Sequence, residues 1–163
     1  MFKVGILTAS DKGSKGLRED LSGKLIKEII EKNGFEVVRT VIVQDDKEDI
    51  KTELIYMADE LKVELILTTG GTGFSKRDVT PEATLEVVDR LALGISYAIL
   101  NKSLEKTPHA MLSRAVSGIR NDTLIINLPG SPRAVEESLE VILEALPHGL
   151  EILTGRASEC ARE

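Results

Sequence analysis

The sequence LILTTGGTGFSKRDVTP, residues 65–81, combines an apolar run, a glycine-rich loop and a helix start. We expect Leu65–Thr69 to form a buried strand, because a short apolar run bounded by turn residues is typical of one. Three glycines follow within four residues, and a helix is expected to begin at Thr80–Pro81 with Thr80 as its N-cap. Glycine allows positive φ and a close approach of the backbone, so that exposed N–H groups can bind oxyanions. This order of strand, glycine loop and helix therefore predicts an α/β fold with an anionic ligand at the loop.

The segments on both sides of this stretch alternate between strand and helix patterns with short connections. Strand patterns occur at residues 2–8, 36–43 and 65–69, and helix patterns at 20–33, 47–61, 80–91, 95–104 and 134–146, with a further short helix expected up to residue 153. Ala9–Gly16 is predicted to be a polar loop. Two short runs, Ser117–Arg120 and Thr123–Asn127, flank Asn121–Asp122 and predict a small β-hairpin. Residues 1–163 are thus expected to form a single domain, a doubly wound three-layer α/β fold with a mostly parallel central sheet.

Two aspartates, Asp45 and Asp78, follow different strands of the predicted sheet. Since the carboxyl ends of parallel strands meet at one edge, we expect both to lie beside the glycine loop. A pair of carboxylates near bound phosphates suits Mg²⁺, and a metal with fixed charges suits phosphoryl or nucleotidyl transfer. Loop aspartates are more often caps or turn formers, and Asp46 or Asp11 could take the same role.

The overall composition argues against several classes of partner. The net charge is −6 and aromatic residues make up only 3%, which disfavours a general nucleic-acid binder. The single cysteine, Cys160, allows neither an internal disulfide nor a cysteine metal cluster. No apolar run approaches the roughly 20 residues that a membrane helix needs, and the N-terminus lacks a signal-peptide layout. We expect a cytoplasmic protein with no membrane partner.

The glycine loop does not match the common nucleotide-binding fingerprints. No Walker A run occurs, and Lys76 occupies the position of the third glycine in the dinucleotide pattern. A purely structural turn is the simpler alternative, although an ordinary turn needs one glycine rather than three. Lys76 and Arg77 either neutralise phosphate charge or lie in solvent, and the sequence leaves both interpretations open.

Several segments in order resemble the signature of the MogA/MoaB family of molybdenum cofactor biosynthesis proteins, and of the G domain of gephyrin. The resemblance is carried by Thr68–Phe74 and Arg77–Thr84, supported by Ser10-Asp11, Leu112–Arg114 and Asn127–Pro132. It implies an α/β fold, usually a homotrimer, that binds molybdopterin and adenylylates it. In that reaction the terminal phosphate of molybdopterin attacks the α-phosphate of Mg-ATP, which gives adenylylated molybdopterin and pyrophosphate.

The same resemblance implies roles for particular residues. The two essential aspartates of the family fall on Asp45 and Asp78, which would hold Mg²⁺ and the phosphates. The residues implied in substrate binding are Asp11, Thr69, Gly70, Gly71, Thr72, Gly73, Ser113, Pro129, Gly130, Ser131 and Pro132.

A second hypothesis is that the protein binds molybdopterin without catalysing a reaction. Related domains of the molybdate-insertion proteins and some MoaB-type paralogues would hold molybdopterin without adenylylating it. The presence of both Asp45 and Asp78 favours the active enzyme, because a binding protein would not need two carboxylates at the phosphates. For the enzyme, the resemblance implies an assembly of three or six copies and transient contact with a molybdate-insertion protein.

Overall fold

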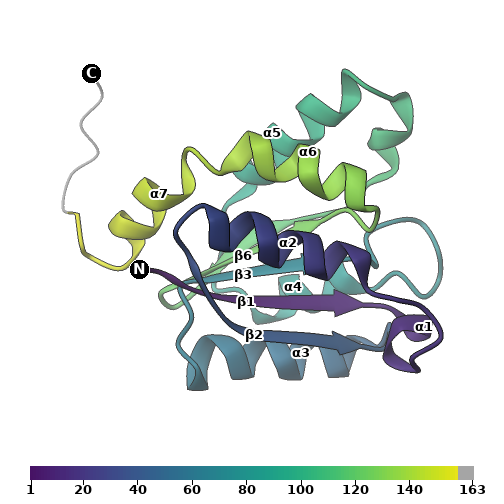
Figure 1. The fold of residues 1–163 in the computed structure, drawn as a ribbon, viewed down its shortest axis with the longest axis horizontal. Coiled ribbons are helices and arrows are strands. Elements are labelled where there is room, and N and C mark those ends of the chain that lie inside the picture. Colours follow the sequence, from purple (N-terminus) through teal and green to yellow (C-terminus); the bar gives the residue numbers. More distant parts are fainter. Residues whose placement is uncertain (158–163) are drawn as a thin grey trace.

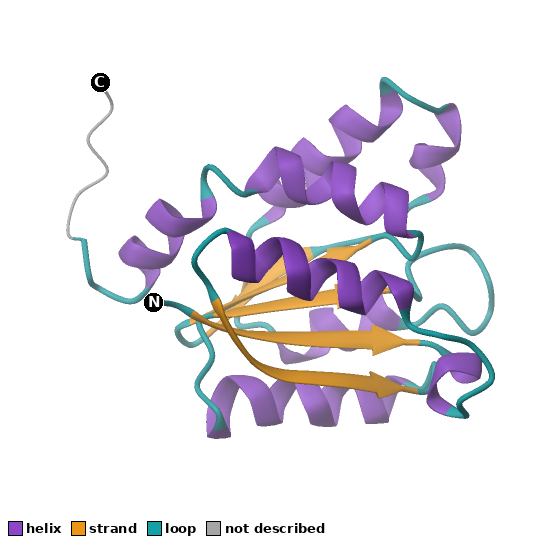
Figure 2. Cartoon of the chain, in the orientation of Figure 1, coloured by secondary structure: helices purple, strands orange, loops and turns teal. Residues whose placement is uncertain are grey.

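A computed structural model describes residues 1–157, which form a mixed sheet between two layers of helices (Figure 1, Figure 2). Its strand order is β2-β1-β3-β6-β5-β4. Four strands run parallel: β1 (Lys3–Ala9), β2 (Glu36–Val43), β3 (Leu65–Thr69) and β6 (Thr123–Leu128). The remaining two, β5 (Ser117–Arg120) and β4 (Arg90–Leu91), are antiparallel to their neighbours. Cys160 lies outside the described residues.

Helices cover both faces of the sheet, as the alternation of strand and helix patterns predicts. One face carries α2 (Leu21–Lys32), α5 (Leu93–Leu104), α6 (Pro132–Ile142) and α7 (Leu146–Leu153). The other carries α3 (Lys47–Ile55), the π-helical turn η1 (Tyr56–Glu60) and α4 (Thr80–Val87). Two short helices, α1 (Asp11–Ser14) and the 3-10 helix η2 (Pro108–Leu112), complete the described part of the chain.

Strand β1 shows how one run of apolar residues serves two cores. Val4 and Ile6 pack into the core beneath α2 and α6, whereas Leu7 packs into the core beneath α3 and α4. All three side chains are almost fully buried. Burial of one such side chain contributes about 1.5–3 kcal/mol, which explains why a central parallel strand is apolar on both faces.

The strands and the hairpin follow the sequence predictions closely. The bounds of β2 and β3 are confirmed residue for residue, and β5 and β6 form the predicted hairpin, with β6 one residue longer. Asn121 adopts φ +50° in the turn, a conformation that asparagine tolerates better than most residues. The predicted helix at residues 47–61 is present, but its last turn is π-helical, with Leu61 N–H donating to the Tyr56 carbonyl.

Two predictions about the helices were wrong for physical reasons. Helix α4 ends at Val87 rather than near residue 91, because the edge of β5 offers free backbone partners. Asp89 N–H donates to the Ile119 carbonyl at 2.7 Å, and the chain continues as β4. The predicted polar loop at residues 9–16 contains α1, whose first turn is capped by Ser10.

Two helix boundaries also differ from prediction. Thr80 is not an N-cap: it belongs to α4, and its hydroxyl donates to the Gly70 carbonyl at 3.0 Å instead. Residues 134–146 do not form one helix to the end, since α6 stops at Ile142 and α7 starts at Leu146.

Within residues 1–157 no helix has the length and apolarity that crossing a bilayer requires.

Candidate active site

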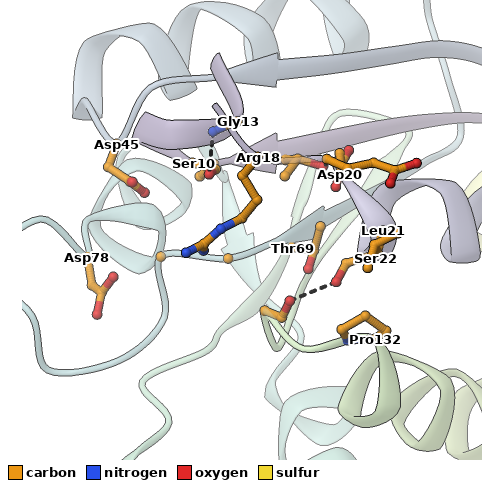
Figure 3. A pocket seen from close by; sticks show the side chains of 16 residues that line it. Ser10, Gly13, Arg18, Asp20, Leu21, Ser22, Asp45, Thr69, Asp78 and Pro132 are labelled. Carbon is orange, nitrogen blue, oxygen red and sulfur yellow. Dashed lines mark hydrogen bonds between the residues drawn. The ribbon is translucent and has the colours of Figure 1, made fainter. Parts of the chain in front are cut away.

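The parallel strands end in step at one edge of the sheet. Thr8 of β1 pairs with Thr69 of β3, which pairs in turn with Leu128 of β6. The segments that follow the four parallel strands therefore start from the same edge. They surround a cavity of about 580 Å³, the strand-end cavity, which is lined in part by Asp45, Thr69, Gly70, Gly71, Asp78, Gly130 and Pro132 (Figure 3).

The glycine loop fits against this edge only because its residues lack side chains. Gly70 has φ +89°, and a Cβ there would lie 2.5 Å from the Ala9 carbonyl oxygen. Gly71 has φ +70°, and a Cβ there would collide with the Thr80 hydroxyl and approach Asp45 Oδ1 to 3.3 Å. Packing alone thus accounts for these two glycines, and it brings the loop backbone directly against the Asp45 carboxylate.

A second turn, residues 129–131 after β6, is hydrogen-bonded to the last residue of β3, where the glycine loop begins. The Thr69 hydroxyl donates to the Pro129 carbonyl at 2.6 Å. From α2, the Ser22 hydroxyl donates to the Gly130 carbonyl at 2.7 Å. Three elements far apart in the sequence are therefore fixed relative to one another at the cavity wall.

Asp45 and Asp11 hold each other in place through their backbones. Asp11 N–H donates to Asp45 Oδ2 at 3.0 Å, and Asp45 N–H donates to Asp11 Oδ1 at 3.0 Å. This reciprocal arrangement ties the segment after β1 to the segment after β2. It also fixes the direction of the Asp45 carboxylate, which lines the strand-end cavity, whereas Asp11 does not line it.

Arg77 is committed to Asp11. Its Nε and Nη2 atoms donate to the two Asp11 oxygens at 3.0 and 2.8 Å, a bidentate pair. The guanidinium of Arg77, with the backbone N–H of Asp45, lowers the pKa of Asp11 to about 2. Of the two uses that the sequence left open for Arg77, the structure shows the solvent-exposed one: the side chain is 60% exposed, and its guanidinium anchors the glycine loop to α1.

The Asp45 carboxylate, in contrast, has little compensation for its negative charge. Burial raises its pKa, and the nearby charges of Asp11 and Asp78 raise it further, while the N–H of Asp11 acts in the opposite direction. Asp78 lies in the same cavity and accepts a hydrogen bond from Ser75 N–H at 3.0 Å. A pair of carboxylates with excess negative charge fits a divalent cation.

No group of three or more His, Cys, Asp or Glu side chains that could hold a metal occurs among the described residues. Mg²⁺ commonly uses one or two carboxylates together with water and phosphate oxygens. Asp45 and Asp78 could therefore hold Mg²⁺ only together with a phosphate-bearing ligand and water, and not as a site made of protein ligands alone.

Arg114 holds the glycine loop and the start of α4 in place through hydrogen bonds and an ion pair. Its backbone N–H donates to the Thr72 carbonyl at 2.8 Å, its Nε to the Gly73 carbonyl at 2.8 Å and its Nη2 to the Asp78 carbonyl at 2.6 Å. It also forms an ion pair with Glu82. No local pattern in the sequence signals this role of Arg114, because all of these partners are 32 or more residues away.

A second cavity, of about 440 Å³, lies between α5, η2 and the same two turns. We call it the α5–η2 cavity; its lining includes Thr72, Ser113 and Pro129. Apolar side chains such as Ile99 and Leu100 contribute to its wall. The glycine loop supplies Gly71 to one cavity and Thr72 to the other, and the turn after β6 supplies Gly130 and Pro129 in the same way. The two turns thus form a shared wall between two cavities.

The remaining candidate residues support the site without lining either cavity. Gly73 lies against the carboxylate of Asp78, since a Cβ on Gly73 would be 2.9 Å from Asp78 Oδ2. Ser131 caps α6 by accepting from Ala134 N–H at 3.3 Å. Sequence reasoning also missed Ser22 and Arg18, which line the strand-end cavity from α2 and from the segment before it.

Known proteins and a family model match this chain over most of its length. Residues 5–148 match the family model described as a probable molybdopterin binding domain. A Helicobacter pylori (strain ATCC 700392 / 26695) protein named molybdopterin adenylyltransferase is 44% identical over 155 residues, covering 93% of this chain and 88% of that protein. The Escherichia coli (strain K12) protein of the same name is 35% identical over 177 residues, covering 99% and 90%.

The solved structures agree with the fold. The molybdopterin biosynthesis enzyme MoaB from Thermus thermophilus is 49% identical and superimposes with a TM-score of 0.90, covering 95% of this chain and 98% of that one. The predicted α/β fold with a mostly parallel sheet is therefore confirmed.

Proposed function

The chain belongs to the family of probable molybdopterin-binding domains, and from that premise we propose that it is a molybdopterin adenylyltransferase. It transfers AMP from ATP to the terminal phosphate of molybdopterin and releases pyrophosphate. The observation that carries this proposal is the pair of cavities with a shared wall, since a transfer between two substrates needs two adjoining sites.

In this proposal the phosphates of ATP occupy the strand-end cavity. Asp45 and Asp78 would hold Mg²⁺ there together with phosphate oxygens. Bound in this way, the cation would neutralise charge on the phosphates and stabilise the transition state of an in-line displacement. Gly70 and Gly71 line the same cavity, so their backbone N–H groups would add donors to the phosphates, and such fixed donors cost little reorganisation during the reaction.

Molybdopterin occupies the α5–η2 cavity in this proposal. Apolar residues and the Ser113 hydroxyl offer a ring system both contact area and a polar partner. Its terminal phosphate would cross the shared wall near Thr72 and Pro129 to reach the α-phosphate of ATP. Asp11 and Ser131 act through other residues: Asp11 orients Asp45 and holds Arg77, and Ser131 caps α6.

We expect the protein to act as a homotrimer, or as a hexamer made from two trimers. An exposed apolar surface around α5 and η2 supports self-association, because α5 buries only Ile99 fully. Its exposed members include Leu91 (52%), Tyr97 (58%) and Met111 (64%). Light scattering on the purified protein tests this, with a monomer as the contrary result.

The reaction consumes ATP, so we expect it to take place in the cytoplasm. We expect the adenylylated product to pass to a molybdate-insertion protein through a transient contact.

The proposal is tested by mixing the protein with molybdopterin and Mg-ATP and analysing the products. Adenylylated molybdopterin and pyrophosphate in equal amounts are the expected result. Tight binding of molybdopterin without either product would instead identify a non-catalytic binding protein. No observation on the described residues favours that alternative.

A further inference from the structure

Within residues 1–157, one basic side chain lines the strand-end cavity. Arg18 is the only Arg or Lys among the described residues that line it, and the lining carboxylates are Glu19, Asp20, Asp45 and Asp78. A triphosphate carries several negative charges and would be repelled by such a surface. A ligand of this kind therefore needs cations in the cavity, of which Mg²⁺ at the aspartates is one and a basic side chain is the other.

The other arginines around the glycine loop already have partners. Arg77 forms its bidentate pair with Asp11, and Arg114 binds two carbonyls and Glu82. Arg18 makes no hydrogen bond or ion pair with any described residue, although four carboxylates line the same cavity. Figure 3 shows its side chain extending toward the part of the cavity where Asp45 and Asp78 lie.

We propose that Arg18 binds the β- and γ-phosphates of ATP and stabilises the pyrophosphate leaving group; this rests on the proposed function. A guanidinium presents several N–H donors in a fixed plane and can bind a phosphate with two of them. Arg18 lies in the segment between α1 and α2, which is exposed to solvent, so its side chain has room to adjust to a ligand.

The position of Arg18 assigns it to the leaving group rather than to the attacking phosphate. In the proposed reaction the attacking phosphate arrives across the shared wall, near Thr72 and Pro129, whereas Arg18 reaches the strand-end cavity from the segment before α2. In an in-line displacement the two groups lie on opposite sides of the reacting phosphorus. A bond forms between the molybdopterin phosphate oxygen and the α-phosphorus. The bond from the α-phosphorus to the α–β bridging oxygen breaks, and its electron pair departs with the pyrophosphate that Arg18 holds.

Arg18→Gln tests this role, with Lys15→Gln as the matched control. Lys15 lies in the same segment and is exposed, but it does not line the cavity, so its substitution removes the same charge without touching the proposed site. Binding of Mg-pyrophosphate is measured by calorimetry, independently of turnover. Steady-state kinetics give kcat and KM for each substrate, and thermal melting confirms that both variants are folded.

Arg18→Gln should weaken Mg-pyrophosphate binding by about 10- to 100-fold, as expected for the loss of charge-assisted hydrogen bonds. It should lower kcat/KM for ATP by a comparable factor and leave the KM for molybdopterin unchanged. Arg18→Lys should restore part of the loss, and Lys15→Gln should change binding by less than about 2-fold.

Equal binding by wild type and Arg18→Gln would overturn the inference, as would an equal loss in Lys15→Gln or a wild type that does not bind Mg-pyrophosphate. A different result would reject the proposed function while leaving the Arg18 site in place. If the wild type binds Mg-pyrophosphate through Arg18 but forms no adenylylated molybdopterin, the Arg18 site stands and the transferase proposal does not.

Discussion

Substitution of Gly70 by alanine tests whether the glycine loop is held rigidly against the end of β1. Two costs are expected. The residue has φ +89°, where an L-residue pays about 1–2 kcal/mol, and the new Cβ would lie 2.5 Å from the Ala9 carbonyl oxygen. That oxygen belongs to the backbone of a buried strand and cannot move freely, so overpacking should add about 1–3 kcal/mol.

Gly34→Ala separates the two costs. Gly34 has nearly the same φ, +84°, but nothing lies within 4 Å of its Cβ position. Gly34→Ala should therefore lower stability by about 1–2 kcal/mol, and Gly70→Ala by about 1–3 kcal/mol more. At roughly 2–4 °C per kcal/mol for a chain of this size, the difference between the variants is about 2–12 °C in Tm.

Urea unfolding and thermal melting of both variants measure these values. If Gly70→Ala and Gly34→Ala lose the same stability, the loop moves away from β1 at no cost, and the argument for a rigid cavity wall is refuted. Adenylyl transfer should fall in Gly70→Ala and persist in Gly34→Ala, since only Gly70 lines the strand-end cavity.

Three further predictions concern the charges of the site. Arg114→Met should lower the free energy of unfolding by about 1–3 kcal/mol, because it removes the donors to two loop carbonyls, and unchanged urea unfolding would contradict this. Burial raises the pKa of Asp45 above 3.8, the ordinary value of an aspartate. The protonated side chain therefore stabilises the folded protein below pH 3.8, and this contribution is lost as the pH rises through the folded pKa. Asp45→Asn should accordingly raise Tm at pH 7 relative to wild type and do so less at pH 4; a lower Tm at pH 7 is the contrary outcome. Mg²⁺ with pyrophosphate should raise the Tm of wild type but not that of Asp78→Asn, and equal shifts would exclude Asp78 from the metal site.

The sequence predicts those parts of the fold that local patterns control. Strand β3 and the glycine loop are predictable because an apolar run and three glycines are visible within nine residues. The hairpin is predictable because Asn121-Asp122 marks its turn. Strand β4 is not, since it depends on backbone partners on β5 about 30 residues away. Its formation is a matter of tertiary pairing, which overrides the helical pattern of residues 80–91.

The candidate site, too, has some features that the sequence predicts and others that it does not. The meeting of the segments that carry Asp45 and Asp78 follows from the topology of a parallel sheet, which the sequence implied. The engagement of Arg77 by Asp11, and of the glycine loop by Arg114, could not be predicted. Each links residues more than 40 positions apart through side-chain geometry that leaves no periodic signal in the sequence.

ATP labelled at the α-phosphate shows whether Asp45 and Asp78 serve adenylyl transfer in the strand-end cavity. Wild type, molybdopterin and Mg-ATP should give labelled adenylylated molybdopterin and one pyrophosphate per transfer. Asp78→Asn, folded with a Tm close to that of wild type, should give neither. Release of ADP and inorganic phosphate by wild type, or turnover of folded Asp78→Asn at the wild-type rate, would refute this role of the two aspartates.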